Sequence, residues 1–583
     1  MKIRFIGPLG KVTGSCTWMR DEANDWNFLV DCGMQQGERT AAEWNACDWP
    51  FDPAEIKFVI LTHAHIDHCG LIPMLYRKGF RGLVYCSRET AEIAKILLRD
   101  AAELSDIGFT AKDVDAVRWH EPRRTPLFGH FHPLDTNLFL RFFRSGHVIG
   151  AVSVAIHWGA PGPDQRSIAF SGDLGPNVED RESLPFLRHR MYAGSNDFAV
   201  IESTYGGTVR TAQQSDPEHR RAQLRGLLDR TISRTGSLII PAFALGRVQD
   251  VLFDLHWIVA ENPERYEGVE FRIDAPSARR MNGVVLEALR RTESNGKNGK
   301  VRPLWLGKQM FRWFELDDKD TAHVQTVLDI CHMTLQAEAG EAVTRPACGN
   351  AVARAWRPLF RSIANRRQHA SNDSVRASVY VVSSGTCDGG PAAWWLPKLI
   401  TSPNNTVALA GYCSASTVGG QLLSLAQVSP EERRRLTGSL AWPGGTAIPL
   451  AEIAADIVAL SGYSAHADQT GLIDWMLNHH KDELRLVGKA VFIQHGGDLQ
   501  REGLAKAIEA KAAMEGVAVR AMTPSDPSLW FDLGKDASEI SDEACLREME
   551  DEIARLSREI ARRRGLPGRP GGGASAGQSG RAG

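Results

Sequence analysis

The chain has 583 residues, of which 43% are hydrophobic, so it exceeds a single hydrophobic core and we expect a globular protein of two or more domains. The chain has 68 Lys and Arg residues and 70 Asp and Glu residues, which excludes a globally basic nucleic-acid-binding protein. A polyanion would have to bind at a local cluster of arginines or at a metal. The ten cysteines form no Cys-x-x-Cys pair, and no run of about 18 apolar residues occurs, so we expect reduced thiols, a cytoplasmic location and no membrane span.

The N-terminal part of the chain alternates short apolar segments with turns and a few helices. We expect strands at 3–6, 28–30, 58–61, 83–86, 138–143, 152–157, 167–171 and 198–201. This pattern predicts a sheet-rich α/β domain. Several of the strands end at or near a residue of a type that binds metals, namely Asp31, His63, His147, Asp173 and Glu202. Because side chains at neighbouring strand ends converge on one rim of a sheet, we expect a functional site there.

The pattern of expected helices and strands changes near residue 208. Helices are expected at 218–230 and 247–259, with strands at 237–240, 271–274, 378–382 and 406–409. This alternation predicts a second α/β domain with a parallel sheet. Residues of the metal-binding type return only after it, at 464–468 and 494–497, so we interpret the second domain as an insertion into the first.

Residues 295–375 give only weak strand signals. Within them, residues 353–367 carry five arginines among apolar side chains and are expected to form a basic amphipathic helix. Such a helix could hold phosphates, but we favour an ordinary solvated helix face.

These observations divide the chain into five expected parts. They are a first domain in two pieces at 1–207 and 461–535, an insertion at 208–460, a charged helix at 536–565 and a disordered tail at 566–583. Apolar residues repeat at spacings of three and four along the charged helix. We therefore expect residues 540–565 to pack against the rest of the protein, or to contact a second copy of the chain or a partner in a processing complex.

The most informative segment follows the strand at 58–61, where residues 63–68 read His-Ala-His-Ile-Asp-His. Imidazoles suit zinc, and a carboxylate among them allows two ions to share one pocket. A single histidine is more often an ordinary core or surface residue. Four such groups at this spacing could not be buried together without a cation, so the segment predicts part of a metal site.

In order and local context, Asp31, the 63–68 segment, His147 and Asp173 resemble the ligand motifs of the metallo-β-lactamase superfamily. Further segments resemble its β-CASP branch of nucleic-acid phosphodiesterases, and especially the RNA-processing nucleases such as the nuclease subunit of the cleavage and polyadenylation specificity factor. These segments are 201–206, 240–247, 382–385, 411–412 with Tyr412, 464–468 and 495–496. The resemblance covers residues 1–500 apart from 295–375. It implies an α/β fold, a metallo-β-lactamase αββα sandwich with an inserted β-CASP domain of the parallel-sheet type.

The resemblance also implies two zinc ions per chain. The expected metal ligands are His63, His65 and His147 for one ion, Asp67, His68 and His495 for the other, and Asp173 as a bridge. Each ion then has at least three protein ligands and a free position for a substrate oxygen. Asp31 is expected to orient ligand side chains from behind.

Asp67, Glu202 and His466 are the expected catalytic residues. We interpret His466, within 464–468, as a general acid that Glu202 positions and keeps protonated, because a neighbouring carboxylate raises the basicity of an imidazole. An ordinary structural role stays open for His466 and for His495.

Contacts to substrate phosphates are expected at Arg247, which opens a helix, and at a strand end formed by Ser383, Ser384 and Gly385. Both places are also ordinary helix-start and turn positions. Tyr205 could stack on a base of the substrate.

The resulting hypothesis is a zinc-dependent ribonuclease that hydrolyses single-stranded RNA by a two-metal mechanism and leaves 5′-phosphate and 3′-hydroxyl ends. His495 favours RNA, since the resemblance implies an aliphatic residue there in DNA-cleaving relatives. The alternatives are a DNA nuclease or repair enzyme on the same scaffold and a non-catalytic RNA-binding subunit of a processing complex. The insertion and the 464–468 segment argue against a small-molecule hydrolase. The sequence leaves open whether cutting is internal, as by an endonuclease, or also from the 5′ end, as by an exonuclease.

Overall fold

A computed structural model of the chain describes residues 1–36, 41–104, 107–122, 127–294, 301–363, 366, 377–411 and 413–535. The expected C-terminal helix at 536–565, the tail at 566–583 and Tyr412 lie outside the described residues. The cysteines of the described part are free thiols. Within the same part, no helix combines the length and the apolar character needed to cross a membrane.

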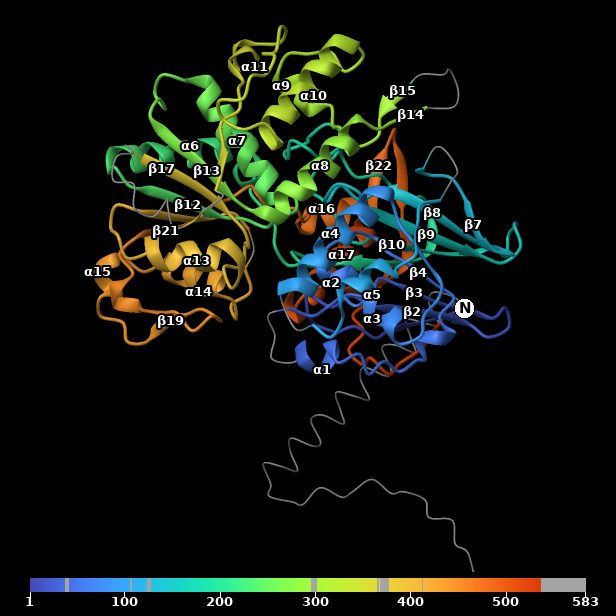
Figure 1. The fold of residues 1–583 in the computed structure, drawn as a ribbon. Coiled ribbons are helices and arrows are strands. Elements are labelled where there is room, and N and C mark those ends of the chain that lie inside the picture. The colour runs from blue at the N-terminus through green and yellow to red at the C-terminus, as the bar shows by residue number, and fades with distance from the viewer. Residues whose placement is uncertain are drawn as a thin grey trace, which may run out of the picture.

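Two seven-stranded sheets form the first domain (Figure 1). In spatial order, the first sheet consists of β26 (Phe531–Asp532), β1 (Lys2–Phe5), β2 (Thr17–Asp21), β3 (Trp26–Val30), β4 (Phe58–Ile60), β5 (Leu83–Tyr85) and β6 (Trp119–His120). The second consists of β25 (Arg520–Met522), β24 (Gly488–Gln494), β11 (Asn196–Glu202), β10 (Arg166–Phe170), β9 (Val152–Trp158), β8 (Leu138–Arg144) and β7 (His132–Asp135). Both sheets mix parallel and antiparallel pairs. All eight strands expected in this part of the chain are present.

The period-2 pattern of the strands places one face of each sheet in a shared core. In β10, Ile168 and Phe170 join the apolar cluster between the sheets, whereas Ala169 belongs to a second cluster on the outer face with Trp475 and Leu504. The helices that follow the first-sheet strands are α1 (Ala41–Asn45), α2 (Ile66–Cys69), α3 (Ile72–Arg77), α4 (Arg88–Leu104) and α5 (Ala111–Asp115), with a 3₁₀ turn η1 (Pro53–Glu55). On the outer face of the second sheet lie α16 (Gln469–Met476) and α17 (Asp498–Met514). The result is the expected αββα sandwich.

The inserted domain is built on a six-stranded sheet in which every pair is parallel (green to orange in Figure 1). Its strands in spatial order are β16 (Arg361–Ser362), β13 (Val269–Asp274), β17 (Ala377–Val382), β12 (Ser237–Pro241), β18 (Thr406–Leu409) and β21 (Asp456–Ala459). Apolar residues face both sides of the central strands, as expected for a sheet that helices cover on both faces. One face packs on α6 (Pro217–Ser233), α7 (Arg247–Glu261) and α8 (Pro276–Arg290), the other on α13 (Gly390–Leu399) and α14 (Val418–Leu425).

The stretch without recognisable motifs forms a mainly helical cap. It contains β14 (Thr292–Ser294), β15 (Val301–Pro303), α9 (Gln309–Trp313), α10 (Thr321–Leu335) and α11 (Ala351–Ala355). The remaining elements are η2 (Gln213–Ser215), α15 (Pro430–Arg433), β19 (Ser439–Ala441), β20 (Ala447–Pro449), η3 (Leu450–Glu452), β22 (Leu477–His480) and β23 (Glu483–Leu486).

The expected basic helix at 353–367 is wrong. The helix ends at Ala355, Trp356 is extended with ψ of 136°, and β16 follows at Arg361. Pro358 explains the early end, because its ring disfavours helical geometry in the preceding residue and it has no N–H to donate. Part of the segment, residues 364, 365 and 367, lies outside the described residues. Trp356 is 1% exposed and packs in the core. The apolar residues of this segment therefore occur because the segment is buried, and they do not form one face of a helix.

A buried ion pair joins the two domains. Arg220 of α6 donates from Nε and Nη2 to the carboxylate of Asp254 of α7, at 2.6 and 3.1 Å. Its Nη1 donates to the backbone oxygen of Ser183 in the first domain at 2.8 Å. Tyr463, in the segment that returns from the insertion, donates its hydroxyl to Asp254 at 2.8 Å. The pair therefore fixes the point where the chain leaves and re-enters the first domain.

We predict that Arg220→Ala lowers the free energy of unfolding by about 3–5 kcal/mol, because it leaves the Asp254 carboxylate buried without its cation. Urea unfolding followed by tryptophan fluorescence measures the change. Arg230→Ala is the matched control, since Arg230 lies on the same helix with an exposed side chain. Equal stability of the two variants would contradict the structural role of the pair.

Candidate active site

The candidate residues lie at or shortly after the ends of six strands, at one rim of the sandwich. In the first sheet, β3 is followed by Asp31 and β4 leads to the 63–68 segment. In the second sheet, β10 is followed by Asp173, β11 ends with Glu202, and β24 is followed by His495. His147 lies in the turn between β8 and β9. The structure thus brings together residues that are up to 464 positions apart in the chain.

The carboxylate of Asp173 lies at the centre of the site. Its Oδ2 is 3.4 Å from Nε2 of both His63 and His147. Its Oδ1 is 3.3 Å from Nε2 of His68 and 3.5 Å from Nε2 of His495. Although burial alone would raise the pKa of Asp173, the surrounding histidines hold it well below its usual value. Each oxygen of one carboxylate therefore faces a different group of imidazoles.

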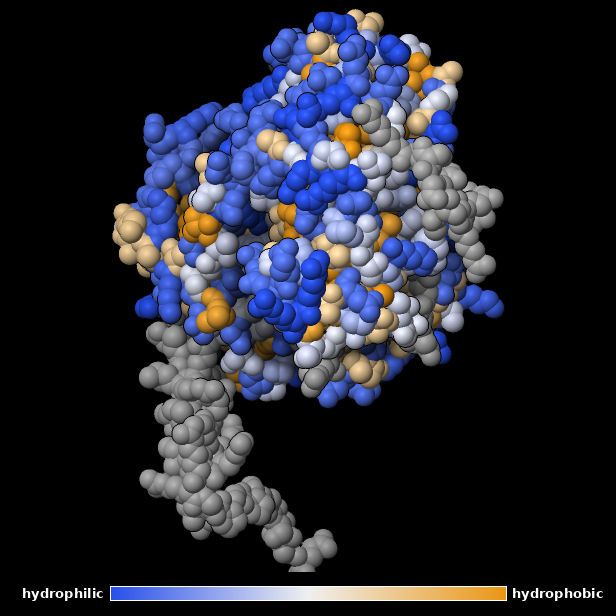
Figure 2. Space-filling view, turned by 90° about the vertical axis from the view of Figure 1, so that its left-hand side faces the viewer, coloured by the Kyte–Doolittle hydropathy of each residue, from blue (hydrophilic) through white to orange (hydrophobic). Residues whose placement is uncertain are grey.

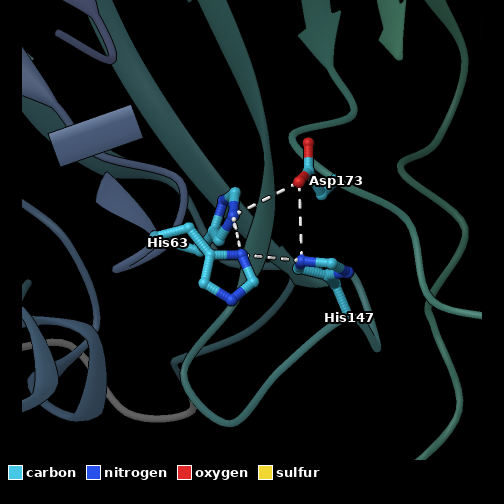
Figure 3. A group of neighbouring side chains, drawn as sticks. His63, His147 and Asp173 are labelled. Carbon is cyan, nitrogen blue, oxygen red and sulfur yellow. Dashed lines mark hydrogen bonds and ion pairs between the residues drawn. The ribbon is translucent and has the colours of Figure 1, made fainter. Parts of the chain in front are cut away.

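The first group surrounds Oδ2 of Asp173. Figure 3 shows the rings of His63 and His147 and the Asp173 carboxylate pointing toward a common centre. Nδ1 of His65 lies 3.1 Å from Nε2 of His63 and 3.0 Å from Nε2 of His147. Burial lowers the pKa of His65 and His147 well below the ordinary value, so these rings are neutral and have lone pairs to offer. The four side chains form a set with the donor atoms and spacing that suit one metal ion.

The second group, Asp67, His68 and His495, surrounds Oδ1 of Asp173, and its ligand atoms also lie within 4.8 Å of one another. Among the residues that the structure describes, three buried polar atoms here make no hydrogen bond: Nε2 of His68, Nε2 of His495 and Oδ1 of Asp173. Leaving three polar atoms unsatisfied in one spot is costly unless something else binds them. A divalent cation satisfies all three at once, so the residues present fit a second metal ion.

Hydrogen bonds from behind orient the rings. Asp31 accepts from Thr62 N at 2.8 Å and from Thr62 Oγ1 at 2.9 Å, and its Oδ2 lies 2.8 Å from Nδ1 of His68. The contacts match the role expected for Asp31. In the same way, the hydroxyl of Ser15 lies 2.8 Å from Nδ1 of His495. The backbone oxygen of Ala465 lies 3.0 Å from Nδ1 of His147. With each Nδ1 occupied, Nε2 of the ring is directed at the centre.

Glycines permit the close approach of the loops that carry the ligands. A Cβ on Gly175 would lie 1.7 Å from the backbone oxygen of Gly146, and one on Gly33 would lie 1.6 Å from that of Asp67. No side chain fits at either place. The loops that carry His147 and Asp173 can therefore approach this closely only because Gly175 has no side chain where it meets the backbone of Gly146.

Glu202 and His466 form a pair beside the two groups. Nδ1 of His466 is 3.2 Å from both carboxylate oxygens of Glu202, and its Nε2 is 4.0 Å from Oδ2 of Asp173. Burial alone would lower the pKa of His466, but the carboxylates of Glu202 and Asp173 raise it above the ordinary value. Glu202 itself is held by the backbone N–H of Leu174 at 2.7 Å. The two carboxylates therefore favour the protonated form of His466, whose Nε2 faces the centre.

Space for a ligand adjoins this centre. A cavity is lined by Asp31, His68, Asp173, Glu202 and His495, together with residues of the loop between β1 and β2. The cavity thus borders the second group of ligands.

The residues expected to bind phosphates lie in the insertion. Arg247 is 3% exposed, donates to the backbone oxygen of Tyr463 and pairs with Asp250 at 2.8 Å. Ser383 and Ser384 follow β17, and Gly385 packs against Phe243, so closely that a Cβ would lie 2.8 Å from the ring. Phosphate binding by Arg247, Ser383, Ser384 and Gly385 stays a prediction.

Sequence reasoning missed Arg210. Its backbone N–H donates to Asp468 Oδ2 and its Nη1 to the backbone oxygen of His466, both at 2.8 Å. The guanidinium also lies 4.4 Å from the centroid of the Tyr205 ring. Arg210 thus ties the loop after Glu202 to the segment that carries His466. Nothing in the spacing of Arg210 from Glu202 signals this contact.

Two family models match the chain. The model of the metallo-beta-lactamase superfamily matches residues 9–224, and the model of the Beta-Casp domain matches residues 248–422. Ribonuclease TTHA0252 of Thermus thermophilus is 28% identical over 493 residues, which are 82% of this chain and 90% of that protein. Transcription termination factor FttA of Methanocaldococcus jannaschii is 24% identical over 486 residues, which are 82% of this chain and 64% of the factor. Among solved structures, zinc-bound PqqB of Methylobacterium extorquens aligns with 36% of this chain and 75% of its own, at 11% identity and a TM-score of 0.24.

We predict that Asp31→Ala lowers the affinity for divalent metal about 10- to 100-fold, because the variant leaves Nδ1 of His68 without the group that orients it. Competition with a chromogenic chelator measures the affinity. Asp25→Ala is the matched control, since the Asp25 carboxylate is 83% exposed and pairs only with Lys57 among the contacts of the described residues. Unchanged affinity in Asp31→Ala would contradict the orienting role.

Proposed function

Because the chain belongs to the metallo-β-lactamase superfamily and carries a Beta-Casp domain, we propose that it is a ribonuclease that hydrolyses phosphodiester bonds of single-stranded RNA with the help of two zinc ions. One observation carries the proposal. The two oxygens of Asp173 face two separate groups of ligand-type side chains, with the Glu202–His466 pair beside them. This arrangement suits a reaction in which negative charge develops on a phosphate.

The donor set supports zinc as the metal. The first group offers three imidazole nitrogens, and the second offers two imidazoles and a carboxylate, which are the ligands that zinc prefers over harder oxygen-seeking ions. When bound there, such a pair of ions lowers the pKa of a water molecule and draws charge from the phosphate oxygens. Asp173, Asp67 and the histidines would hold the two ions.

The remaining steps fall to residues of the chain. Water adds to phosphorus and releases one proton to solvent, and the bond from phosphorus to the 3′ oxygen of the preceding nucleotide breaks. His466 gives the proton on Nε2 to that oxygen, while Glu202 holds Nδ1 and compensates the charge of the imidazolium. The products are a 5′-phosphate and a 3′-hydroxyl end, and the imidazole regains its proton from solvent.

Several observations favour RNA as the substrate. A ribonuclease is among the relatives that are similar over most of their length. His495 occupies the position at which the family resemblance implies an aliphatic residue in DNA-cleaving relatives. We propose that Ser383, Ser384, Gly385 and Arg247 approach the phosphates of the strand once it lies between the domains. A cytoplasmic location, and a partner that binds through 540–565, stay predictions.

A DNA nuclease on the same scaffold is the second candidate, and a non-catalytic RNA-binding subunit is the third. Every ligand position of both groups is occupied by a side chain that can bind a metal, which argues against the subunit without activity.

We predict that the metal-loaded protein cleaves labelled single-stranded RNA and leaves 5′-phosphate ends, whereas a DNA oligomer of the same sequence is cut far more slowly. Treatment with a chelator followed by gel filtration abolishes the cleavage, and added zinc restores it, since the site depends on the cations for charge stabilisation. Undiminished cleavage after complete metal removal rules the mechanism out. Faster cleavage of the DNA oligomer selects the second candidate.

We predict that His466→Ala lowers kcat on RNA about 10²- to 10⁴-fold, which is the usual contribution of a general acid. Its metal content stays that of the wild type, because both groups of ligands are complete without His466, although His466 and Glu202 form a third such cluster with Asp173. His479→Ala serves as the control, since His479 lies at the protein surface and contacts Glu515. A rate within twofold of the wild type in His466→Ala excludes the acid role.

A further inference from the structure

Two apolar side chains stand exposed at the rim of the active site. Leu499 is 82% exposed and lies in the first turn of α17, four residues after His495. Val209 is 62% exposed and lies on the loop that follows Glu202. The two segments are neighbours, because a Cβ on Gly207 would lie 3.4 Å from the backbone oxygen of Leu499. Single exposed apolar residues need no explanation, but two on adjoining segments beside a reactive centre do.

Polar side chains fasten this rim in place. Gln500 accepts from the backbone N–H of Gly207 at 2.6 Å, next to Leu499 in the chain. Gln469 of α16 donates from Nε2 to the backbone oxygen of Gly206 at 2.7 Å, and its N–H donates to that of Thr208 at 2.9 Å. The loop that bears Val209 is therefore tied to both α16 and α17. These hydrogen bonds hold the backbone near Val209 and Leu499 in the position that leaves both side chains exposed to water.

The same loop reaches into the reaction centre. Arg210, next to Val209, donates to the backbone oxygen of His466, and the ring of Tyr205 lies 6.3 Å from the ring of His466. On the other side, His495 lies in the short connection between β24 and α17, and Leu499 lies in the first turn of that helix. The apolar pair is thus continuous with the site and not a separate patch of surface.

We propose that Val209 and Leu499 form a subsite that contacts the faces of nucleobases in the RNA strand next to the bond being cut. The inference rests on the proposed function. When the phosphates of a single strand face the cations, the apolar faces of its bases remain exposed to solvent. Contact with Val209 and Leu499 removes part of this apolar area from water. Neither side chain has a hydrogen-bonding group, so the contact does not depend on which base is present. Bases in a duplex have their faces stacked on one another, so the subsite also favours single strands.

The test compares Leu499→Ala and Val209→Ala with Met514→Ala. Met514 is a matched control, because it lies at the other end of α17 with the same 82% exposure. Fluorescence anisotropy with a labelled 12-nucleotide RNA, in the presence of chelator so that no strand is cut, gives Kd for the full-length proteins. A second RNA carries abasic residues in place of the central bases.

We expect Leu499→Ala to weaken binding of the normal RNA about tenfold, from the loss of a buried Leu contact, and Val209→Ala to weaken it less. Met514→Ala binds like the wild type. With the abasic RNA the wild type already binds weakly, and the variants lose nothing further. In the metal-loaded proteins the change appears in KM, while kcat stays constant.

Three results would overturn the subsite. They are equal Kd values for Leu499→Ala and Met514→Ala, an equal penalty for Leu499→Ala on normal and abasic RNA, and a change of sedimentation state in Leu499→Ala without a change in Kd. The last result would assign the pair to a contact between two copies of the chain. Failure of the wild type to cleave RNA, together with the expected pattern of Kd values, would instead refute the proposed reaction and leave the subsite standing.

Discussion

The buried carboxylate of Asp173 is the constraint on which the site depends. One side chain with 2% exposure lies within 4.0 Å of nitrogens from five histidines, and those histidines come from both sheets and from the segment after the insertion. A carboxylate in such a place is stable only as an anion among groups that bind or share positive charge. The crossing of Gly146 and Gly175, which excludes any side chain, follows from the need to bring its loop this close. The sandwich is the frame that holds these loops.

The inserted domain contributes to the site through its points of attachment. Arg220 and Asp254 join the insertion to Tyr463, three residues before His466. Arg190 extends the same connection, since its guanidinium bonds the backbone oxygens of Gly175 and Gly471 at 2.9 and 3.0 Å. His466 is therefore positioned by contacts with both domains. As Figure 2 shows, the face that the insertion presents to solvent is mostly hydrophilic with scattered apolar residues, and the apolar content of the insertion lies in its cores.

Much of this arrangement could be predicted from the sequence, because strand-end residues are local signals. A run of apolar residues followed by Asp31, His63 or Asp173 predicts both the strand and the position of the side chain at its end. Features set by contacts across the chain could not be read in the same way. The arginines at 353–367 suggested a helix, and Pro358 together with the burial of Trp356 prevented it. Likewise, no local pattern distinguishes Arg210, whose partners are 256 and 258 residues away.

The position of β24 in the second sheet has a consequence for the synthesis of the protein. This strand pairs with β11 in parallel across nearly 300 residues of intervening chain, and it carries His495 at its end. On the ribosome, strands β1 to β6 of the first sheet and the whole insertion emerge before the last ligand does. A nascent chain therefore has no complete ligand set until His495 has been synthesised. A ribosome-bound chain that ends before this residue cannot cut the messenger RNA that encodes it.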